Sequence, residues 1–563
     1  MRQFVFWVGC FFLSAPIFAE EFKVGSVIHP VVAKLPPPQM IEAFAKGQMA
    51  ISASSDEAAA HVTQGIARLN TSWDFEAYRH FCAAAKLDPD CLMAYWGITM
   101  SLAGSQHEFF KQRQLAVERM LDLLEAEEAA KENRWTQLEK GYAQAAGFLL
   151  TGGVRAAGET FQAIATNYPV DIQSKLLSLF LQRDGFDDSG RPLVGQRKAS
   201  EGLQVILEAN PENLSVRSFW VSSQSESPLN VPFIREKVLP IARDLAGKHP
   251  DYPPFYLMLA HVEGRCGNAA MAIAAASKAC QLYQVYMAGE GVTFYDCECW
   301  VRAKVYLISL HEMKGEHAQA MIIAEELAVL KIDEKRLFSR GAGLLLWEGR
   351  TAGARAVMGR SDEASLQEGQ KNLARSSKEQ WFQDKSYALQ YRDCLGFYLA
   401  VRKAILARDL KGAKVVFELF LGKIRVMAEG RGLASKTSTY ASWVRAMNTL
   451  TMMIPELRGM LAEMEEGAMQ RAATTWYQSA MGQQGRPSNL LPPTVDYPME
   501  LRLGDFYLSQ SQFKKAKEVY REGLALRPNH LQTLKGYHQA LVKLGWKEAA
   551  AVIEKRMKAV AQQ

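Results

Sequence analysis

The feature of this 563-residue sequence that most limits its fold is a spacing of small, aromatic and proline residues that occurs three times. Five positions follow one another at intervals of 12, 4, 3 and 5 residues. Small residues at two positions let neighbouring helices approach closely, a ring fills the groove between them, and the proline ends the second helix. The copies are Gly65, Ala77, Phe81, Ala84 and Pro89; Ala145, Ala157, Phe161, Ile164 and Pro169; and Gly504, Ala516, Tyr520, Gly523 and Pro528.

Partial copies of the same spacing lie between the complete ones. Ala199 and Leu203 precede a proline in frame, and Gly267 and Ala272 carry another fragment. From residue 53 onward the apolar pattern is helical nearly everywhere and signals for strands are scarce. Each helix pair leaves an apolar face that only the next pair covers, so the sequence predicts an all-α solenoid with essentially no sheet.

The spacing resembles that of the tetratricopeptide repeat, or TPR, superfamily. Residues 494–550 match it best, and residues 73–97 are similar to the opening repeats of large bacterial TPR proteins with no assigned reaction. The resemblance implies a right-handed superhelix of degenerate repeats, with a concave face for a peptide, a helix or a partner subunit. It carries no particular binding residues over to this chain. The positions behind the match at 494–550 are Leu503, Gly504, Tyr507, Phe513, Ala516, Tyr520, Leu524, Pro528, Gly545 and Ala550.

Composition shifts divide the chain into seven predicted segments. Proline, glycine and serine cluster in stretches that we expect to interrupt the helices. The predicted segments are a signal peptide at 1–19, a proline-containing arm or linker at 20–52, an N-terminal TPR-like array at 53–347, a polar break at 348–380, a helical block at 381–481, a Pro/Gly-rich linker at 482–499 and basic C-terminal repeats at 500–563.

The first residues have the pattern of an export signal. Arg2 precedes an apolar run from Phe4 to Phe18, and Ala19 supplies a small residue for cleavage. An uncleaved membrane anchor is the alternative, but the run is short for a membrane span. We therefore expect an exported protein, periplasmic in the first instance, with an extracellular or outer-membrane-associated location as alternatives. Cleavage would remove Arg2 and Cys10, lowering the net charge from +6 to +5 and the cysteine count from 8 to 7.

Charge is concentrated at the C-terminus. Residues 501–563 contain 12 Lys or Arg and 5 Asp or Glu, a local balance of +7. Such a segment suits an acidic partner or an anionic lipid surface, and it is also typical of solvated helix faces. The sequence has no aromatic-interleaved basic module, so no nucleic-acid partner is expected.

Motifs for catalysis, metals and cofactors are weak or missing. Residues 430–437 nearly match a phosphate-binding loop, but Ser435 replaces the final glycine, so a connection between helices is the better interpretation. Cys297 and Cys299 lack the C-x-x-C spacing and second half-site of a zinc or redox centre, and we expect most cysteines to be buried. The sequence therefore predicts no enzyme activity, no cofactor and no metal.

These observations lead to one main function and two alternatives. The first is a non-catalytic exported scaffold that binds a protein, peptide or partner subunit in the cell envelope. The second is an accessory subunit of envelope assembly, secretion or polysaccharide export that docks through the basic C-terminal repeats. A minor alternative is an enzyme with a site in the middle helical block.

Overall fold

The computed structural model describes residues 22–45, 49–103, 107–151, 153–187, 190–227, 231–375, 387–434, 439–484, 491–493 and 495–562. Throughout this described part the regular structure is helical, apart from one isolated antiparallel bridge between Phe186 and Pro192. Among these residues no helix is both long enough and apolar enough to span a bilayer. The predicted signal peptide lies outside them and stays a prediction.

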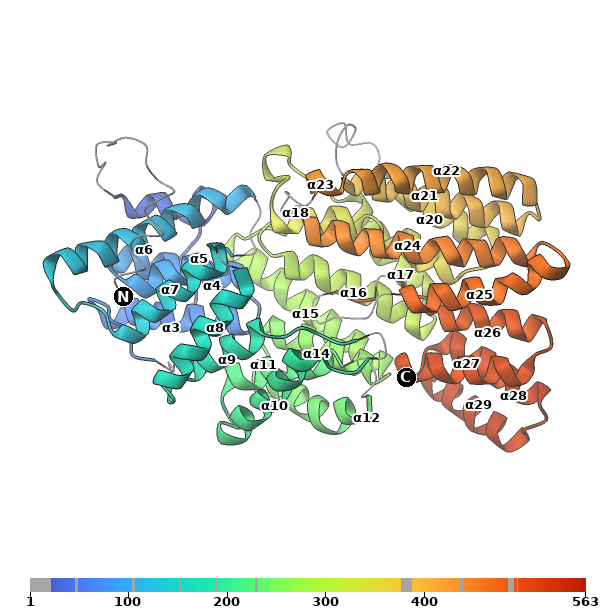
Figure 1. Ribbon diagram of the computed structural model, residues 1–563, viewed down its shortest axis with the longest axis horizontal. Helices are drawn as coiled ribbons and strands as arrows, with labels where there is room; N and C mark the ends of the chain where they lie inside the picture. The colour runs from blue at the N-terminus through green and yellow to red at the C-terminus, as the bar shows by residue number, and fades with distance from the viewer. Residues whose placement is uncertain are drawn as a thin grey trace.

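Helices of the N-terminal half follow one another in pairs, as the blue to green ribbon of Figure 1 shows. Short 3-10 and π-helices carry the label η. The elements are η2 (Val24–Val27), α2 (Pro30–Ala33), η3 (Glu42–Phe44), α3 (Asp56–Asn70), α4 (Asp74–Leu87), α5 (Leu92–Ser101), η4 (His107–Phe109), α6 (Phe110–Ala130), α7 (Gln137–Thr151), α8 (Gly153–Asn167), α9 (Ile172–Leu181), α10 (Val194–Ala209), α11 (Leu214–Ser225), α12 (Val231–Phe233), η5 (Ile234–Val238), α13 (Leu239–Lys248), α14 (Pro253–Arg265), α15 (Ala269–Glu290), α16 (Glu298–Lys314) and α17 (His317–Val329).

The second half continues with shorter elements and then with longer helices. Its last helices, in red, lie beside the green middle of the chain (Figure 1). The elements are η6 (Glu334–Arg336), α18 (Arg340–Leu344), η7 (Leu345–Gly349), α19 (Ala352–Ala356), η8 (Val357–Gly359), α20 (Glu363–Arg375), α21 (Tyr387–Leu406), α22 (Leu410–Glu429), α23 (Arg431–Ala434), α24 (Tyr440–Glu463), α25 (Gly467–Gln483), α26 (Met499–Ser509), α27 (Phe513–Leu526), α28 (Leu531–Lys543) and α29 (Lys547–Gln562).

The repeated spacing corresponds to a repeated contact. In the first copy the Phe81 ring on α4 lies between Gly65 on α3 and Gly97 on α5. A Cβ atom added at Gly65 would lie 2.6 Å from the ring, and one at Gly97 would overlap it. The two glycines therefore let three helices close around one fully buried aromatic side chain.

The C-terminal repeats build the same contact. Tyr520 on α27 lies between Gly504 on α26 and Gly536 on α28, where an added Cβ at Gly536 would lie 2.5 Å from the ring. Pro528 stands in the turn that follows α27. This agreement between distant segments confirms the predicted all-α helix–turn–helix solenoid.

The remaining frame residues occupy equivalent places. Alanines that allow close helix approach are fully buried, as is the ring of the middle copy. Each of the prolines stands in the turn that follows the second helix of its repeat. The buried residues are Ala77, Ala84, Ala145, Ala157, Phe161, Ala272 and Ala516, with Tyr507 nearly as buried, and the prolines are Pro89, Pro169 and Pro528.

Inner helices of the N-terminal array contact one another across the superhelix. The side chain of Asn70, at the end of α3, donates to Gln173 of α9 at 2.8 Å and to Ser215 of α11 at 2.9 Å. Gln173 donates back to Asn70 at 3.0 Å. A buried polar network therefore joins three helices that are far apart in the sequence.

Residues 348–375, which we expected to be a polar break, are mostly helical and substantially buried. Their glycines allow close packing: an added Cβ would lie 2.6 Å from Tyr497 at Gly359 and 2.5 Å from Val357 at Gly369. The glycine content here reflects tight helix contacts, which composition alone does not distinguish from a loop.

One buried carbonyl fixes this region to the C-terminal repeats. The backbone oxygen of Met358 accepts from Arg402 of α21 at 2.7 Å and from Arg502 of α26 at 2.5 Å. Arg502 also pairs with the buried carboxylate of Glu456 at 2.9 Å. The helical block and the C-terminal repeats thus share one continuous apolar core with the residues from 301 onward.

The predicted linker at 482–499 ends where α26 begins at Met499. Residues 491–493 and 495–498 are non-helical, and residues 485–490 and 494 lie outside the described part. The turn after α27 then reaches the middle of the chain, where the Asn529 side chain donates to the carbonyl of Gly267 at 2.7 Å. The C-terminal repeats therefore fold back on α14 to α16.

Candidate functional site

The N-terminal array holds an extended segment of its own chain. Gln64 on α3 accepts from the backbone nitrogen of Ile41 at 3.1 Å and donates to its carbonyl at 2.8 Å. Arg68, one turn later, donates to the carbonyl of Gln39 at 2.9 Å. Side chains that satisfy both polar groups of a backbone residue bind an extended chain whatever its side chains are.

A buried ion-pair network anchors the same segment. Arg79 of α4 donates to Glu76 at 2.7 Å, to Glu290 of α15 at 2.7 Å and to the carbonyl of Pro36 at 2.9 Å. The side chain of Gln39 donates to Glu290 at 2.7 Å. The charge of Arg79 is thus shared by two carboxylates and one backbone carbonyl, which satisfies most of a buried guanidinium.

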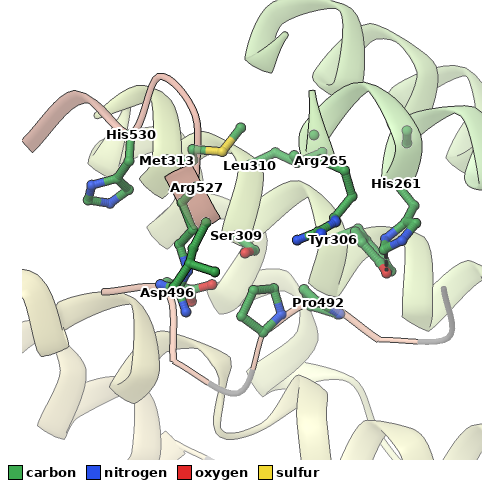
Figure 2. Close-up of a pocket in the computed structure, with 14 residues that line it drawn as sticks. His261, Arg265, Tyr306, Ser309, Leu310, Met313, Pro492, Asp496, Arg527 and His530 are labelled. Carbon is green, nitrogen blue, oxygen red and sulfur yellow. Dashed lines mark hydrogen bonds between the residues drawn. The ribbon is translucent and has the colours of Figure 1, made fainter. Parts of the chain in front are cut away.

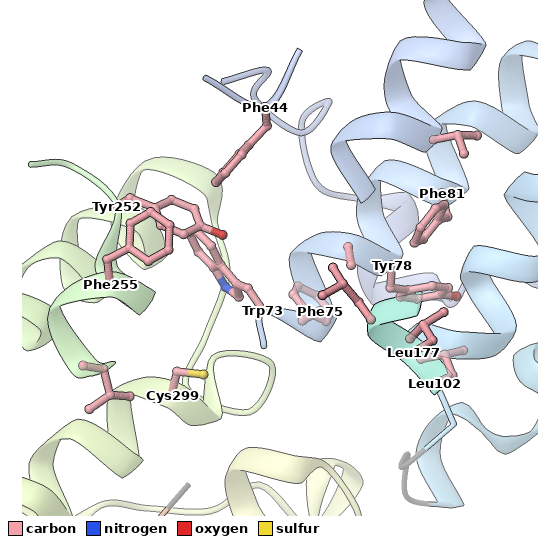
Figure 3. Packing of buried hydrophobic residues seen from close by; sticks show 14 of the residues in the cluster. Phe44, Trp73, Phe75, Tyr78, Phe81, Leu102, Leu177, Tyr252, Phe255 and Cys299 are labelled. Carbon is pink, nitrogen blue, oxygen red and sulfur yellow. The ribbon is translucent and has the colours of Figure 1, made fainter. Parts of the chain in front are cut away.

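An aromatic cluster receives the end of the segment. Figure 3 shows Phe44 pointing from the N-terminal segment toward Tyr252, with Trp73 and Phe255 alongside. The ring centroids of Phe44 and Tyr252 lie 5.1 Å apart and those of Trp73 and Tyr252 lie 5.4 Å apart, both edge-to-face. Residues 36–44 therefore occupy the surface, formed by α3, α4, α15 and the turn before α14, where an extended partner would otherwise lie.

A second feature is a cavity of about 60 Å³ between the middle of the chain and the C-terminal repeats. Figure 2 shows Arg265 and Tyr306 on one side, and Arg527 and Asp496 on the other. The lining residues are Ala260, His261, Gly264, Arg265, Tyr306, Ser309, Leu310, Met313, Pro492, Pro493, Asp496, Leu526, Arg527 and His530.

The titratable groups of this cavity are perturbed mainly by burial. Burial, with the charge of Arg527, lowers the pKa of His530 to about 3. Burial, with the charge of Arg265, lowers the pKa of His261 to about 3, and Tyr306 lies 3.0 Å from its Nδ1 atom. Both imidazoles are therefore neutral near pH 7, and arginine supplies the positive charge of the cavity.

The two arginines differ from ordinary surface arginines. Burial lowers the pKa of Arg265 to about 10, although it still donates to the carbonyl of Ser227 at 2.5 Å. Burial also lowers the pKa of Arg527, against the opposing charges of Glu500 and Asp496. Burial raises the pKa of Asp496 in turn. Charges of both signs therefore line one small space.

The surface of the last repeat is basic and partly apolar. Trp546 is 48% exposed, and the Lys517 ammonium lies 4.3 Å from the centroid of its ring. Val542 and Val552, at the end of α28 and in α29, are 53% and 66% exposed. Lys514, Lys515, Lys535, Lys543, Lys547, Lys555 and Lys558 are exposed as well.

The cysteines have no site chemistry within the described residues. All seven, including Cys297 and Cys299, are buried and unpaired. Burial raises the pKa of Cys82 and of Cys394 to about 12. They are thus small buried hydrophobic side chains, as expected for most of them.

Other candidate motifs remain structural. Residues 431–434 form the short helix α23 between α22 and α24, and the rest of the phosphate-loop-like motif, at 435–437, lies outside the described part. His61 and His80 lie with their Nδ1 atoms 3.0 Å apart, buried among α3 and α4. No group of three His, Cys, Asp or Glu suited to a metal occurs among the described residues. The predictions of no cofactor and no enzyme activity stay predictions.

No binding residue could be named from the sequence, and the structure brings two sets together. Gln64, Arg68 and Arg79 contact the N-terminal segment, whereas Arg527 and Asp496 face the cavity. A signal existed only for the first set, since polar side chains stand at positions 64 and 68 of one helix, a spacing of one turn.

Comparison with known proteins agrees with this architecture. The family model described as tetratricopeptide repeat matches residues 501–530, which include α27 and most of α26. No curated protein sequence matches the chain. The chain is therefore a helical-repeat protein of the tetratricopeptide type, and the repeat that the family model recognises lies in the basic C-terminal segment.

Solved structures with similar folds were also found. A Cut9–Hcn1 hetero-tetramer of the APC/C is 17% identical, with 86% of this chain and 76% of that chain covered and a TM-score of 0.33. A human IFIT1 dimer with m7Gppp-AAAA is 12% identical, with 84% and 90% covered and a TM-score of 0.33. No functional conclusion follows from likenesses at this level.

Proposed function

We propose that this protein is a non-catalytic, exported scaffold that docks a partner protein of the cell envelope through its C-terminal repeats. The tetratricopeptide architecture supports a role in protein–protein interaction, because stacked helix pairs present large continuous surfaces. Export is inferred from the sequence of residues 1–19.

The observation that carries the choice of surface is the occupied N-terminal array. Residues 36–44 already fill the surface of α3, α4 and α15, and the network at Asn70 joins the inner helices. The C-terminal repeats instead present Trp546 and several lysines to solvent. This contrast favours docking through α26 to α29 over binding in an N-terminal groove.

The exposed groups also define the partner. A half-exposed tryptophan beside lysines suits a partner surface that carries both carboxylates and apolar side chains. The balance of +7 over residues 501–563 would steer an acidic protein toward this end of the molecule. We therefore expect an acidic partner and an association that weakens as salt is added.

The test is in-cell crosslinking of the full chain, with identification of one recurrent partner. Trp546→Ala combined with Lys543→Glu and Lys547→Glu should abolish that crosslink. The matched control is Phe110→Ala with Lys111→Glu and Lys131→Glu, because Phe110 is 53% exposed and carries Arg113 at 5.3 Å from its ring centroid. Equal crosslinking by both variants would contradict docking through the last repeat.

A further inference from the structure

Two buried charged atoms on the cavity walls lack partners. The Nη1 atom of Arg527 and the Oδ1 atom of Asp496 are shielded from solvent, and neither has a hydrogen-bond partner within the described residues. Both residues line the cavity between α14, α16 and the C-terminal repeats. Buried polar atoms are rarely left unpaired, so each calls for a group of opposite character in the cavity.

Simple ions satisfy only half of this requirement. A small anion would accept from Arg527 but would leave the Asp496 oxygen unpaired and repelled. A small cation would serve Asp496 and be repelled by Arg527 and Arg265. A ligand with an anionic and a cationic end would pair with both walls without placing an uncompensated charge in the protein.

The size and lining of the cavity limit the ligand further. A cavity of about 60 Å³ has room for about four to six water-sized groups. The smallest α-amino acids fall in this range. Leu310, Met313 and Leu526 supply apolar walls on which a short aliphatic side chain could rest.

We propose that this cavity binds a small zwitterionic α-amino acid, with its carboxylate on Arg527 and Arg265 and its ammonium group donating to Asp496. Figure 2 shows the geometry behind this orientation: Arg527 and Asp496 reach the cavity from one side, and Arg265 points in from the other. The neutral imidazoles of His261 and His530 complete the polar wall.

The site is shared between separate parts of the chain. Arg265 and Leu310 belong to α14 and α16, whereas Asp496 and Arg527 flank the C-terminal repeats. Bound ligand would therefore bridge these parts and stabilise their contact, in proportion to its concentration over its dissociation constant.

The experiment is calorimetric titration and ligand-observed NMR of the full chain with glycine and L-alanine. Propionate and ethylamine serve as analogues that each lack one charge. We expect saturable binding of at least one amino acid, and binding of each analogue weaker by about tenfold or more. Because this series uses the unaltered protein, it stays decisive even if a variant fails to fold.

Two variants then assign the contacts. Asp496→Asn should weaken amino-acid binding by about tenfold or more and leave propionate unaffected, and Arg527→Gln should weaken both. The control is Arg521→Gln, because Arg521 is exposed and pairs with Glu518 at 2.6 Å. Propionate binding as tightly as alanine would overturn the proposal in favour of a simple anion site. Failure of every probe to bind would overturn it in favour of ordered water.

Discussion

The Phe81 ring occupies the space that a side chain at Gly97 would need. The same relationship joins Tyr520 to Gly504, more than 400 residues later. In both repeats a second glycine lies against the other side of the ring, 16 residues away from it in sequence like the first. One ring between two glycines is thus the unit from which this solenoid is assembled.

Gly97→Ala should destabilise the protein, because the new methyl group overlaps the Phe81 ring and the helices must separate. Overpacking of this kind costs about 1–3 kcal/mol of unfolding free energy. Urea unfolding monitored by circular dichroism measures it. Gly422→Ala is the matched control, since nothing lies within 4 Å of its added Cβ within the described residues, and it should be neutral or stabilising by about 1 kcal/mol.

Gly267→Ala should loosen the C-terminal repeats. Gly267 has φ +79°, and an added Cβ would lie 2.5 Å from the Pro528 carbonyl oxygen. Gly545→Ala imposes a similar φ, +75°, without a contact, so the difference between the variants isolates the clash. We expect faster hydrogen exchange in α26 to α29 for the first variant alone. Equal exchange in both would show that the contact with Pro528 does not hold these repeats.

Gln64→Ala should release the N-terminal segment. It removes both hydrogen bonds to Ile41 and leaves two buried backbone groups unpaired, a cost of about 1–3 kcal/mol. Amide exchange in residues 36–45 should accelerate while α26 to α29 stay protected. Gln114→Ala, which removes only an exposed bond to Glu118, should leave this segment unchanged.

His530→Asn should flatten the acid side of the stability profile. Burial lowers the folded pKa of His530 from 6.5 to about 3, so between these values the unfolded chain binds the extra proton. Stability contributed by the neutral imidazole is therefore present above pH 6.5 and lost as pH falls toward 3. Asparagine can still cap α28 without titrating. The slope of unfolding free energy against pH should fall by about one proton in this window, and an unchanged slope would contradict the buried, neutral state.

Thiol labelling should separate native from unfolded protein. Burial raises the pKa of Cys280 to about 12 and that of Cys299 to about 11, so thiolate is scarce and inaccessible at pH 8. We expect no rapid labelling of the native chain. After unfolding, seven reactive thiols would accompany cleavage of the signal peptide, and an eighth, from Cys10, would show that it is retained.

The sequence was sufficient for the fold because the repeat spacing reports contacts within one helix pair. Phe81 and Tyr520 lie 16 residues from their first glycine and pack exactly on it because local helix geometry dictates the meeting point. The second glycines, Gly97 and Gly536, stand at the same distance on the other side, a signal that the five-position frame did not include.

The candidate sites could not be predicted, because they depend on contacts between distant parts of the chain. Arg527 and Asp496 face Arg265 only because the turn at Asn529 reaches Gly267. Likewise Gln64 and Arg68 have the composition of any polar helix face until residues 36–44 lie on them. The glycines at 353, 359 and 369 were misleading for the same reason, since their neighbours lie on other helices.

The bond from Asn529 to Gly267 also changes how this molecule should unfold. In an open repeat array, stability is a sum of nearest-neighbour terms, and the ends can fray independently. Here a link across 262 residues of sequence couples the last repeats to the middle ones. Loss of one region then removes support from the other, so denaturation should approach a single cooperative transition, and folding should be slowed by the long loop that has to close first.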